Sequence, residues 1–415
     1  MNKIARLGIL LLFVTTVSCQ KTHSDDEFIT TQEKNIALKK IIRKLKKSGY
    51  AFNETFQDIK ERIETNRHII DTTVTIGSFV TVINDVLSTY NLSHLRVNTP
   101  DQMSARKKSE NISLGANFSK TNDGYFVTRI VKGGVADSAG IRPGDFLIRK
   151  NEHLITSLAQ LKGKLFEESR FSIKRDNQVF NRTITYFKHE LFSKDTLHYI
   201  SDDIAVITIN TFRKKEYDRD LIASLFSKAR TSKRIVLDLR SNGGGASSNV
   251  KHLLSMIIPE DTACQYFVHR SDHDAFFEKY KRFPATLKEL VAYRGRVFDP
   301  LSLGWGEEIY KGEIMVMIDE RSGSGGDVFP ICIQDVKRGV VIGNRSLGMV
   351  LAGDRSNLNL GMSFLYPTGE FMRLGGTKLE SNPCIPDVEF SREETANTSF
   401  MHDFIKTYTI NKKSI

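Results

Sequence analysis

The sequence lacks an apolar run long enough to cross a membrane as a helix. Its longest such run, Leu7 to Val17, has eleven residues, whereas a spanning helix needs about 20. Proline and cysteine are also scarce, with 9 and 4 among 415 residues. These low counts exclude a collagen-like chain and a disulfide-stapled scaffold. What remains is the composition of an ordinary globular protein of roughly two or three domains.

The four cysteines are too widely spaced to suggest a metal site. No Cys-x-x-Cys pair occurs, so the spacing typical of structural zinc is absent. We expect Cys264, Cys332 and Cys384 to be buried free thiols, with a single bridge between two of them left open.

The short apolar run near the start has the features of an export signal. Lys3 and Arg6 precede it, and small residues close it at Ser18-Cys19, as in secretory signals. The segment Thr16-Val17-Ser18-Cys19 resembles a bacterial lipobox, which implies removal of residues 1–18 and lipidation of Cys19. Residues 19–28 then form a tether that holds the protein at a membrane of the cell envelope. Simple cleavage and an uncleaved anchor are the alternatives.

The chain is basic, with a formal charge of +11. Export makes an anionic membrane surface, or plain solvation, a better partner for this charge than nucleic acid, and we expect no nucleic-acid partner.

Hydrophobic spacing divides the rest of the chain into regions. Residues 29–100 show a helical period and predict three helices, one of them capped by Asn53. Residues 111–190 alternate in the manner of short strands. Residues 195–390 alternate between buried strands and helices, which predicts an α/β domain, and a polar tail follows over residues 391–415. Strands are expected at 125–131, 145–149, 204–209, 235–239, 314–318 and 340–342, and helices at 217–229, 247–257 and 328–334.

The region 111–190 carries a recognisable motif. Lys132 to Asp145 reads KGGVADSAGIRPGD and follows Asp123-Gly124-Tyr125-Phe126-Val127. This pattern resembles a PDZ domain of the bacterial protease type. The resemblance implies that Leu114, Gly115 and Ala116 form the loop that receives the terminal carboxylate of a peptide. A PDZ domain that acts only as a spacer is the alternative.

Two glycine-rich turns follow predicted strands of the α/β region. Strand 235–239 enters Arg240-Ser241-Asn242-Gly243-Gly244-Gly245, and strand 314–318 enters a turn that contains Gly323-Ser324-Gly325-Gly326. The first turn lacks the Lys-Ser/Thr of a phosphate-binding loop. A serine at a strand-to-helix turn is exposed as a nucleophile would be, and glycine amides can hold an oxyanion.

Together with the PDZ-like region, these two turns resemble the tail-specific (C-terminal-processing) serine peptidases and the related tricorn core protease. The resemblance implies an α+β multidomain fold with an N-terminal helical region, a PDZ domain and a crotonase-like ββα peptidase core. It also implies Ser324 as the nucleophile. Met349 occupies the position of the catalytic lysine of the C-terminal-processing branch, and a thioether cannot accept a proton.

The tricorn-like branch uses a histidine instead. Ser93-His94 matches its Leu-x-x-Ser-His context, and Glu380 lies six residues before Pro386-Asp387, as that branch requires. The resemblance therefore implies His94 as general base and Ser93 and Glu380 as the groups that orient it. The N–H groups of Gly325 and of Gly243 or Gly244 would hold the oxyanion, and no metal or organic cofactor is expected.

The sequence thus predicts a lipid-anchored serine endopeptidase that acts on exported polypeptides. The alternative is a catalytically inactive peptide- or ligand-binding protein that keeps the peptidase fold, which Met349 favours. A purely structural scaffold is a third possibility. Further polar residues are expected to have no chemical role. We expect His269 and His273 to be solvated and Asp335 to be structural. Asp238 and Arg240 should hold the glycine loop in place.

Overall fold

The computed structural model describes residues 22–54, 56–121, 123–176, 178–301 and 309–410. The predicted signal, Cys19 and the first tether residues lie outside this range. Within it, none of the helices combines the length and the apolar character that crossing a membrane requires.

The N-terminal region has four helices instead of the three predicted. They are α1 (Thr31–Ser48), α2 (Ile59–Thr65), α3 (Arg67–Thr72) and α4 (Ile76–Ser88). The extra break falls at Asn66, which ends α2 and begins α3. The predicted cap at Asn53 is wrong: this residue has φ 69 and lies outside the helices. Capping boxes at Thr30 and Thr75 instead begin α1 and α4.

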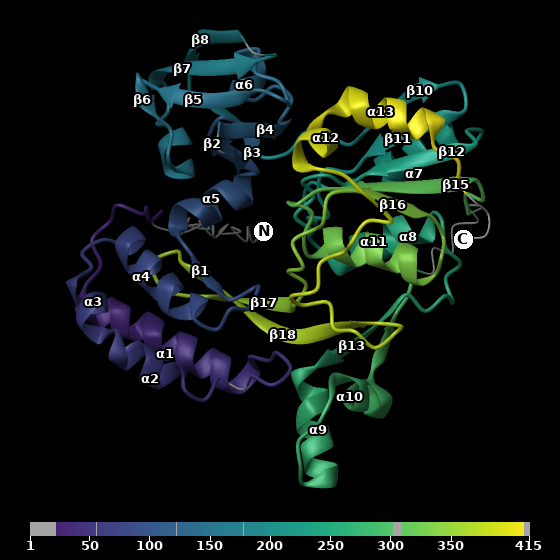
Figure 1. Ribbon diagram of the computed structural model, residues 1–415. Helices are drawn as coiled ribbons and strands as arrows, with labels where there is room; N and C mark the ends of the chain where they lie inside the picture. Colours follow the sequence, from purple (N-terminus) through teal and green to yellow (C-terminus); the bar gives the residue numbers. More distant parts are fainter. Residues whose placement is uncertain (1–21, 55, 122, 177, 302–308, 411–415) are drawn as a thin grey trace, which may run out of the picture.

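One antiparallel sheet pairs a strand from the N-terminal region with strands from the second half of the chain. Its strand order is β1 (Arg96–Asn98), β18 (Ser363–Arg373), β13 (Gln265–His269) and β14 (Arg296–Phe298), and β17 (Ala352–Asn357) also pairs with β18. The helices α1 to α4 pack their apolar faces against β18 (Figure 1). At the other end of the sheet, α9 (Arg270–Tyr280) and α10 (Leu287–Arg294) pack on β13.

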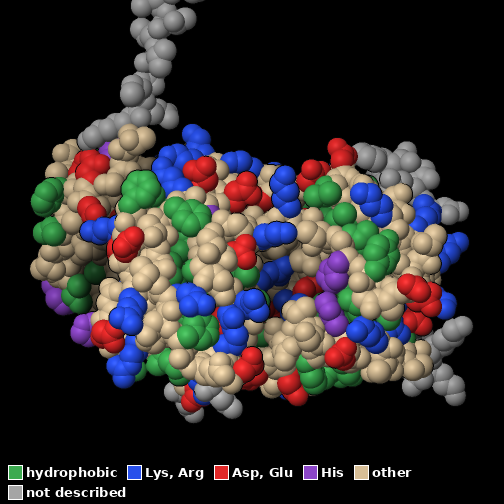
Figure 2. All heavy atoms as spheres, turned by 90° about the horizontal axis from the view of Figure 1, so that it is seen from above, with side chains coloured by type: hydrophobic (Ala, Val, Ile, Leu, Met, Phe, Trp, Pro, Cys, Tyr) green, Lys and Arg blue, Asp and Glu red, His purple; other side chains and the backbone are tan. Residues whose placement is uncertain are grey.

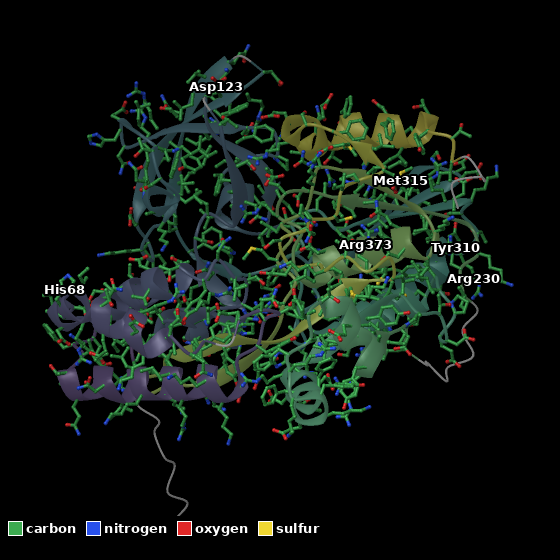
Figure 3. The ribbon with its side chains drawn as sticks, turned by 60° about the horizontal axis from the view of Figure 1, so that its bottom comes forward. His68, Asp123, Arg230, Tyr310, Met315 and Arg373 are labelled. Carbon is green, nitrogen blue, oxygen red and sulfur yellow. The ribbon has the colours of Figure 1, made fainter. Side chains whose placement is uncertain are left out.

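The predicted PDZ region forms a separate small β domain. Its sheet runs β3 (Ala116–Thr121), β4 (Gly124–Ile130), β5 (Phe146–Lys150), β7 (Glu168–Arg175) and β8 (Gln178–Thr185), with β6 (His153–Leu154) on β5. Helix α5 (Pro100–Lys108) leads into it, β2 (Glu110–Ile112) and β9 (Lys188–Glu190) close its base, and α6 (Val135–Ser138) follows β4. Figure 3 shows Asp123 at the outer end of this domain, far from His68 in the helical region and from Met315 in the core.

The third region is an α/β layer structure. Its sheet runs β10 (Thr196–Ser201), β11 (Ile204–Thr208), β12 (Arg234–Asp238), β15 (Glu313–Ile318), β16 (Val340–Gly343) and β19 (Val388–Glu389), parallel except for β10. Helices α7 (Arg219–Ala229), α8 (Ser247–Ser255) and α11 (Gly325–Asp335) cover one face. Every residue of β12 is buried, as a parallel strand covered on both faces requires.

The C-terminal tail is part of this core. Its helices α12 (Arg392–Ala396) and α13 (Thr398–Thr407) lie over the second face of the sheet (Figure 1). Met401 and Ile405 pack against Val236 and Met315 there. The sequence analysis identified this segment only as a polar tail.

The predicted α+β multidomain fold is confirmed, as are the strands and helices expected between residues 125 and 342. Cys264, Cys332 and Cys384 are buried and free, as predicted. The face seen in Figure 2 is hollowed near its middle, and Lys and Arg side chains border the hollow.

Candidate active site

The two glycine-rich turns lie side by side because the strands that carry them are neighbours. β12 and β15 are parallel, and Asp238 is in register with Met317. Their carboxyl ends therefore reach the same edge of the sheet, where open α/β sheets bind their ligands. The predicted turns 240–245 and 319–327 meet at this edge.

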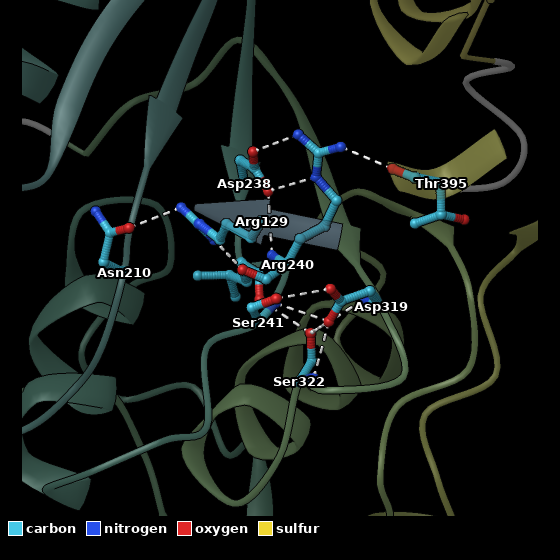
Figure 4. A network of polar contacts seen from close by, with 9 residues as sticks. Arg129, Asn210, Asp238, Arg240, Ser241, Asp319, Ser322 and Thr395 are labelled. Atoms are coloured by element: carbon cyan, nitrogen blue, oxygen red, sulfur yellow. Dashed lines mark hydrogen bonds and ion pairs between the residues drawn. The ribbon is translucent and has the colours of Figure 1, made fainter. Parts of the chain in front are cut away.

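A polar network joins the two turns (Figure 4). The carboxylate of Asp319 accepts hydrogen bonds from the Ser241 N–H at 2.7 Å and from the Ser241 hydroxyl at 3.0 Å. The Ser322 hydroxyl donates to Leu239 O at 2.9 Å, and Gly323 N–H donates to Asn242 O at 3.0 Å. The sequence analysis missed Asp319 and Ser322. Their signal was present, since an Asp three residues before a Ser directly after a strand is typical of a side-chain-closed turn.

Ser324 is held in an uncommon backbone conformation at the start of α11. Its φ is 54 and its ψ is −115, which a residue with a side chain adopts only where the surroundings enforce it. Its own N–H donates to Met349 O at 3.0 Å. Gly244, with φ +84, lies so close that a Cβ there would be 2.5 Å from the Gly325 nitrogen. The tight turn therefore exposes the Ser324 hydroxyl.

The structure brings His94 to Ser324 although 230 residues separate them. His94 lies in the loop between α4 and β1, and the pairing of β1 with β18 fixes this part of the chain. The His94 Nε2 lies 3.4 Å from Ser324 Oγ, and its Nδ1 lies 2.9 Å from Ser93 Oγ. This distance to the serine is long for a hydrogen bond but within the range that a bound substrate tightens.

The hydrogen bonds around Ser93 fix the tautomer of His94. Glu380 accepts from the Ser93 N–H at 2.7 Å and from the Ser93 hydroxyl at 2.9 Å. It also accepts from the N–H groups of Val350 at 2.8 Å and Leu351 at 3.2 Å. Because the single hydroxyl proton of Ser93 points to Glu380, Ser93 Oγ must accept from Nδ1–H of His94. Nε2 is then unprotonated and faces Ser324.

His94 is held neutral at ordinary pH. Burial is the main cause, and the positive charges of Arg96 and Arg355 add to it, so that the pKa of His94 falls to about 4. A neutral imidazole with a free Nε2 lone pair can accept a proton from a hydroxyl.

Of the three amides considered for an oxyanion, two are available. Gly244 N–H donates to Asn242 Oδ1 at 2.9 Å. In the described part of the chain, the N–H groups of Gly243 and Gly325 make no hydrogen bond, and both residues line the same cleft as Ser324.

Met349 lies beside the nucleophile, where the resemblance expected a lysine. Asp327, buried in the first turn of α11, holds the loop that carries Met349: it accepts from the Ser346 hydroxyl and from Gly348 N–H at 3.1 Å. Burial raises the pKa of Asp327 to about 6 despite these hydrogen bonds. Asp327 is a third residue to which the sequence analysis gave no role.

Ser324 and His94 open into a cleft of about 2110 Å³. One part of its wall is apolar, formed by Val250, Phe298, Val328 and Phe371. Another part is basic and includes Arg96, Arg106, Arg213 and Arg355. A cleft of this size accommodates several residues of an extended peptide.

The predicted peptide-binding loop contacts other parts of the small β domain. Leu114 and Gly115 join this loop to α6 and β4 through their carbonyl oxygens, and Ala116 begins β3. The free edge of β3 faces the core, where Arg321 donates to Phe118 O at 3.1 Å. Arg129 of β4 donates to Asn210 Oδ1 at 2.7 Å and to Arg240 O (Figure 4).

The remaining polar candidates are structural. Arg240 bonds Asp238 and Thr395 O (Figure 4); burial opposes ionisation of Asp238, but Arg240 and Arg129 outweigh it and lower its pKa to about 2. Asp335 binds Arg373 at 2.5 Å.

The prediction that His273 is solvated is wrong, because its ring is buried and stacks on Phe283 at 5.0 Å. His269, four residues earlier, lies directly before α9, and its Nδ1 lies 3.2 Å from Thr368 O. Among the described residues, no group of three His, Cys, Asp or Glu side chains could hold a metal ion.

Comparison with known proteins gives the class. Residues 203–390 match the model of peptidase family S41, and residues 102–166 match that of the PDZ domain. The protein is thus a serine-type peptidase with a PDZ domain. These matches confirm the resemblance to the tail-specific (C-terminal-processing) serine peptidases that the sequence indicated.

Individual relatives are distant. A probable CtpA-like serine protease of Staphylococcus epidermidis is 21% identical over 416 residues, which cover 97% of this chain and 75% of that protein. A protein of the same name from Staphylococcus aureus is 23% identical over 283 residues, 67% of this chain and 52% of that protein.

Solved structures share the fold. The photosystem II D1 C-terminal processing protease has a TM-score of 0.56 at 13% identity and covers 91% of this chain and 98% of its own. Mature CPAF has a TM-score of 0.54 at 14% identity, and the match covers 91% of this chain and 97% of the CPAF chain. The tricorn protease has 0.50 at 17%, with 90% of this chain and 36% of its own covered.

Proposed function

We propose that the protein is a lipid-anchored serine endopeptidase that hydrolyses exported polypeptides, with Ser324 as nucleophile and His94 as general base. The observation that carries the proposal is the 3.4 Å approach of His94 Nε2 to Ser324 Oγ. It is supported by the tautomer that Ser93 and Glu380 impose on the imidazole.

The chemistry follows from these groups. His94 Nε2 takes the hydroxyl proton as Ser324 Oγ attacks the scissile carbonyl, and the N–H groups of Gly243 and Gly325 receive the oxyanion. His94 then gives the proton to the leaving amine, which leaves an acyl group on Ser324. A water molecule, deprotonated by His94, hydrolyses this ester. Ser93 and Glu380 are positioning residues, because they act through the imidazole.

Met349 does not oppose this proposal. It removes the lysine base of related enzymes, and its side chain is 41% exposed, but His94, whose Nε2 lies 3.4 Å from Ser324 Oγ, supplies a base. The alternative is an inactive binding protein that keeps the peptidase fold, and the cleavage experiment below distinguishes it from an enzyme.

Cleavage of an unfolded protein substrate by the chain without residues 1–18 tests the assignment. Ser324→Ala and His94→Ala should each abolish cleavage, while Met349→Leu should retain it. Equal activity of the parent and Ser324→Ala would remove the nucleophile, and an active His94→Ala variant would remove the base.

The lipid anchor and the location at the cell envelope rest on the motif at Cys19 alone. The full-length chain should incorporate labelled fatty acid and sediment with membranes, and Cys19→Ser should do neither. Incorporation of label by the Cys19→Ser variant would contradict the proposal.

A further inference from the structure

The basic part of the cleft lies next to the proposed catalytic histidine. In the antiparallel sheet, Arg96 of β1 and Arg355 of β17 are both in register with Leu365 of β18. Residues directly opposite one another across a sheet point to the same face. The two arginine side chains therefore flank Leu365 on one face.

His94 lies on this same face. A Cβ placed on Gly353 would be 3.1 Å from His94 Cβ, 3.2 Å from His94 Cδ2 and 3.1 Å from Leu365 Cδ1. Gly353 precedes Arg355 by two residues along β17, so the two residues face the same way. The imidazole, Leu365 and the two arginines thus line one continuous stretch of the cleft wall.

The positive charges here have no acidic partners. Among the described residues, Arg96, Arg106 and Arg355 form no ion pair, and Arg355 Nη1 is buried without any hydrogen-bond partner. The two acidic residues that line the cleft contact other groups, since Glu216 pairs with Arg213 at 3.1 Å and Asp354 accepts from the Tyr366 hydroxyl at 3.0 Å.

Burial and the neighbouring arginines lower the pKa of Arg355 to about 10. Like charges gathered with a buried, unsatisfied donor are unfavourable unless an anion completes the site.

We propose that Arg355, Arg96 and Arg106 form a subsite for a substrate carboxylate on the leaving-group side of the scissile bond. This inference rests on the proposed function, because the role of His94 determines in which direction the substrate chain runs along the cleft. His94 protonates the leaving amine, so the residues after the scissile bond run along the imidazole side of the cleft. Arg355 lies two residues along β17 from Gly353, the residue beside His94, which is about 7 Å at about 3.3 Å per extended residue. The carboxylate therefore belongs to a residue within about three positions of the bond.

The carboxylate can come from the C-terminus of the substrate or from an Asp or Glu side chain. Both present two oxygens to a guanidinium in the same bidentate geometry. An enzyme with this subsite prefers to remove short C-terminal segments in the first case and to cut before acidic residues in the second.

The test compares three internally quenched peptides built on the bond that the parent cleaves fastest in an unfolded protein. One is neutral and ends in an amide, one ends in a free carboxylate two residues after the bond, and one is amide-ended with Asp at that position. We expect at least one anionic peptide to exceed the neutral one about tenfold in kcat/KM at low salt. Arg355→Gln and Arg96→Gln should bring this ratio close to one.

Arg282→Gln is the matched control. Arg282 is exposed and lies near the end of α9, paired with Glu289, so this variant should keep the parent ratio. Ratios within one variant cancel any change in the basicity of His94. A ratio near one in the parent, or a parent-like ratio in both arginine variants, overturns the subsite.

A binding arm separates this inference from the proposed function. Fluorescence anisotropy with Ser324→Ala should show tighter binding of the anionic peptides than of the neutral one, and Ser324→Ala/Arg355→Gln should lose the difference. If the parent cleaves the neutral peptide but shows no preference in either assay, the subsite fails and the peptidase stands. If the parent cleaves nothing while Ser324→Ala still prefers the anions, the subsite stands and the proposed catalysis fails.

Discussion

Lowering the pH titrates His94, and the low pKa of this residue predicts an unusually acid-tolerant enzyme. The pKa falls from an ordinary 6.5 to about 4 because the ring is buried and faces Arg96 and Arg355. The neutral form is the base, so kcat/KM is full above the pKa of His94 and is lost as the pH falls through it. At pH 5 an imidazole of ordinary pKa would be only about 3% neutral, whereas His94 would be about 90% neutral, a difference of about 30-fold in available base.

The assay is kcat/KM for the neutral peptide between pH 3.5 and 8, with circular dichroism at each pH to show that the fold persists. We expect the acid limb near pH 4 to 5. Removal of the positive charge in Arg355→Gln should move this limb to higher pH, because it removes one cause of the lowered pKa. An acid limb at or above pH 6.5 in the folded parent would refute this reasoning.

Three further substitutions test the site and the fold. Gly244→Ala places a Cβ 2.5 Å from the Gly325 nitrogen and should lower kcat by about 100-fold. Gly375→Ala is the control, because open space surrounds this glycine, and it should not lower kcat. Similar activity of the two variants would contradict the close approach of the turns. Glu380→Gln replaces an oxygen that accepts hydrogen bonds by an amide that donates them, which should lower kcat by about 10²- to 10⁴-fold with little change in KM; an unchanged kcat would remove Glu380 from the site. Lys34→Met leaves the three carbonyl oxygens that Lys34 Nζ binds at the end of α3 without a partner; the free energy of unfolding by urea should fall by about 2 kcal/mol, and an unchanged midpoint would contradict this.

Much of the fold could be predicted because the segments are locally consistent. Apolar runs next to glycine-rich turns predict both the buried strand Arg234–Asp238 and the helix Gly325–Asp335. The exceptions involve long-range contacts. The break at Asn66 depends on packing. The helices α12 and α13 have a largely polar sequence, and their few apolar residues gain a role only because they cover the second face of the sheet.

The site divides in the same way. Ser324 and the glycine turns follow from local pattern, and the juxtaposition of His94 and Glu380 with them rested on family resemblance. The role of Asp327 could not be read from the sequence, because Ser346 and Gly348 come near it only in the folded chain. The role of Asp319 had a local signal in Ser322, which the sequence analysis missed. The arginine cluster is likewise invisible, since Arg96 and Arg355 are 259 positions apart and meet only through their shared neighbour in β18.

The most direct test of the central claim is covalent labelling with a fluorophosphonate probe, mapped by mass spectrometry. A serine activated by a histidine should carry the label at Ser324 alone, and His94→Ala should lower the labelling rate at least about 100-fold. An unlabelled Ser324 in the folded parent, or undiminished labelling in His94→Ala, would contradict a nucleophile and base formed by these two residues.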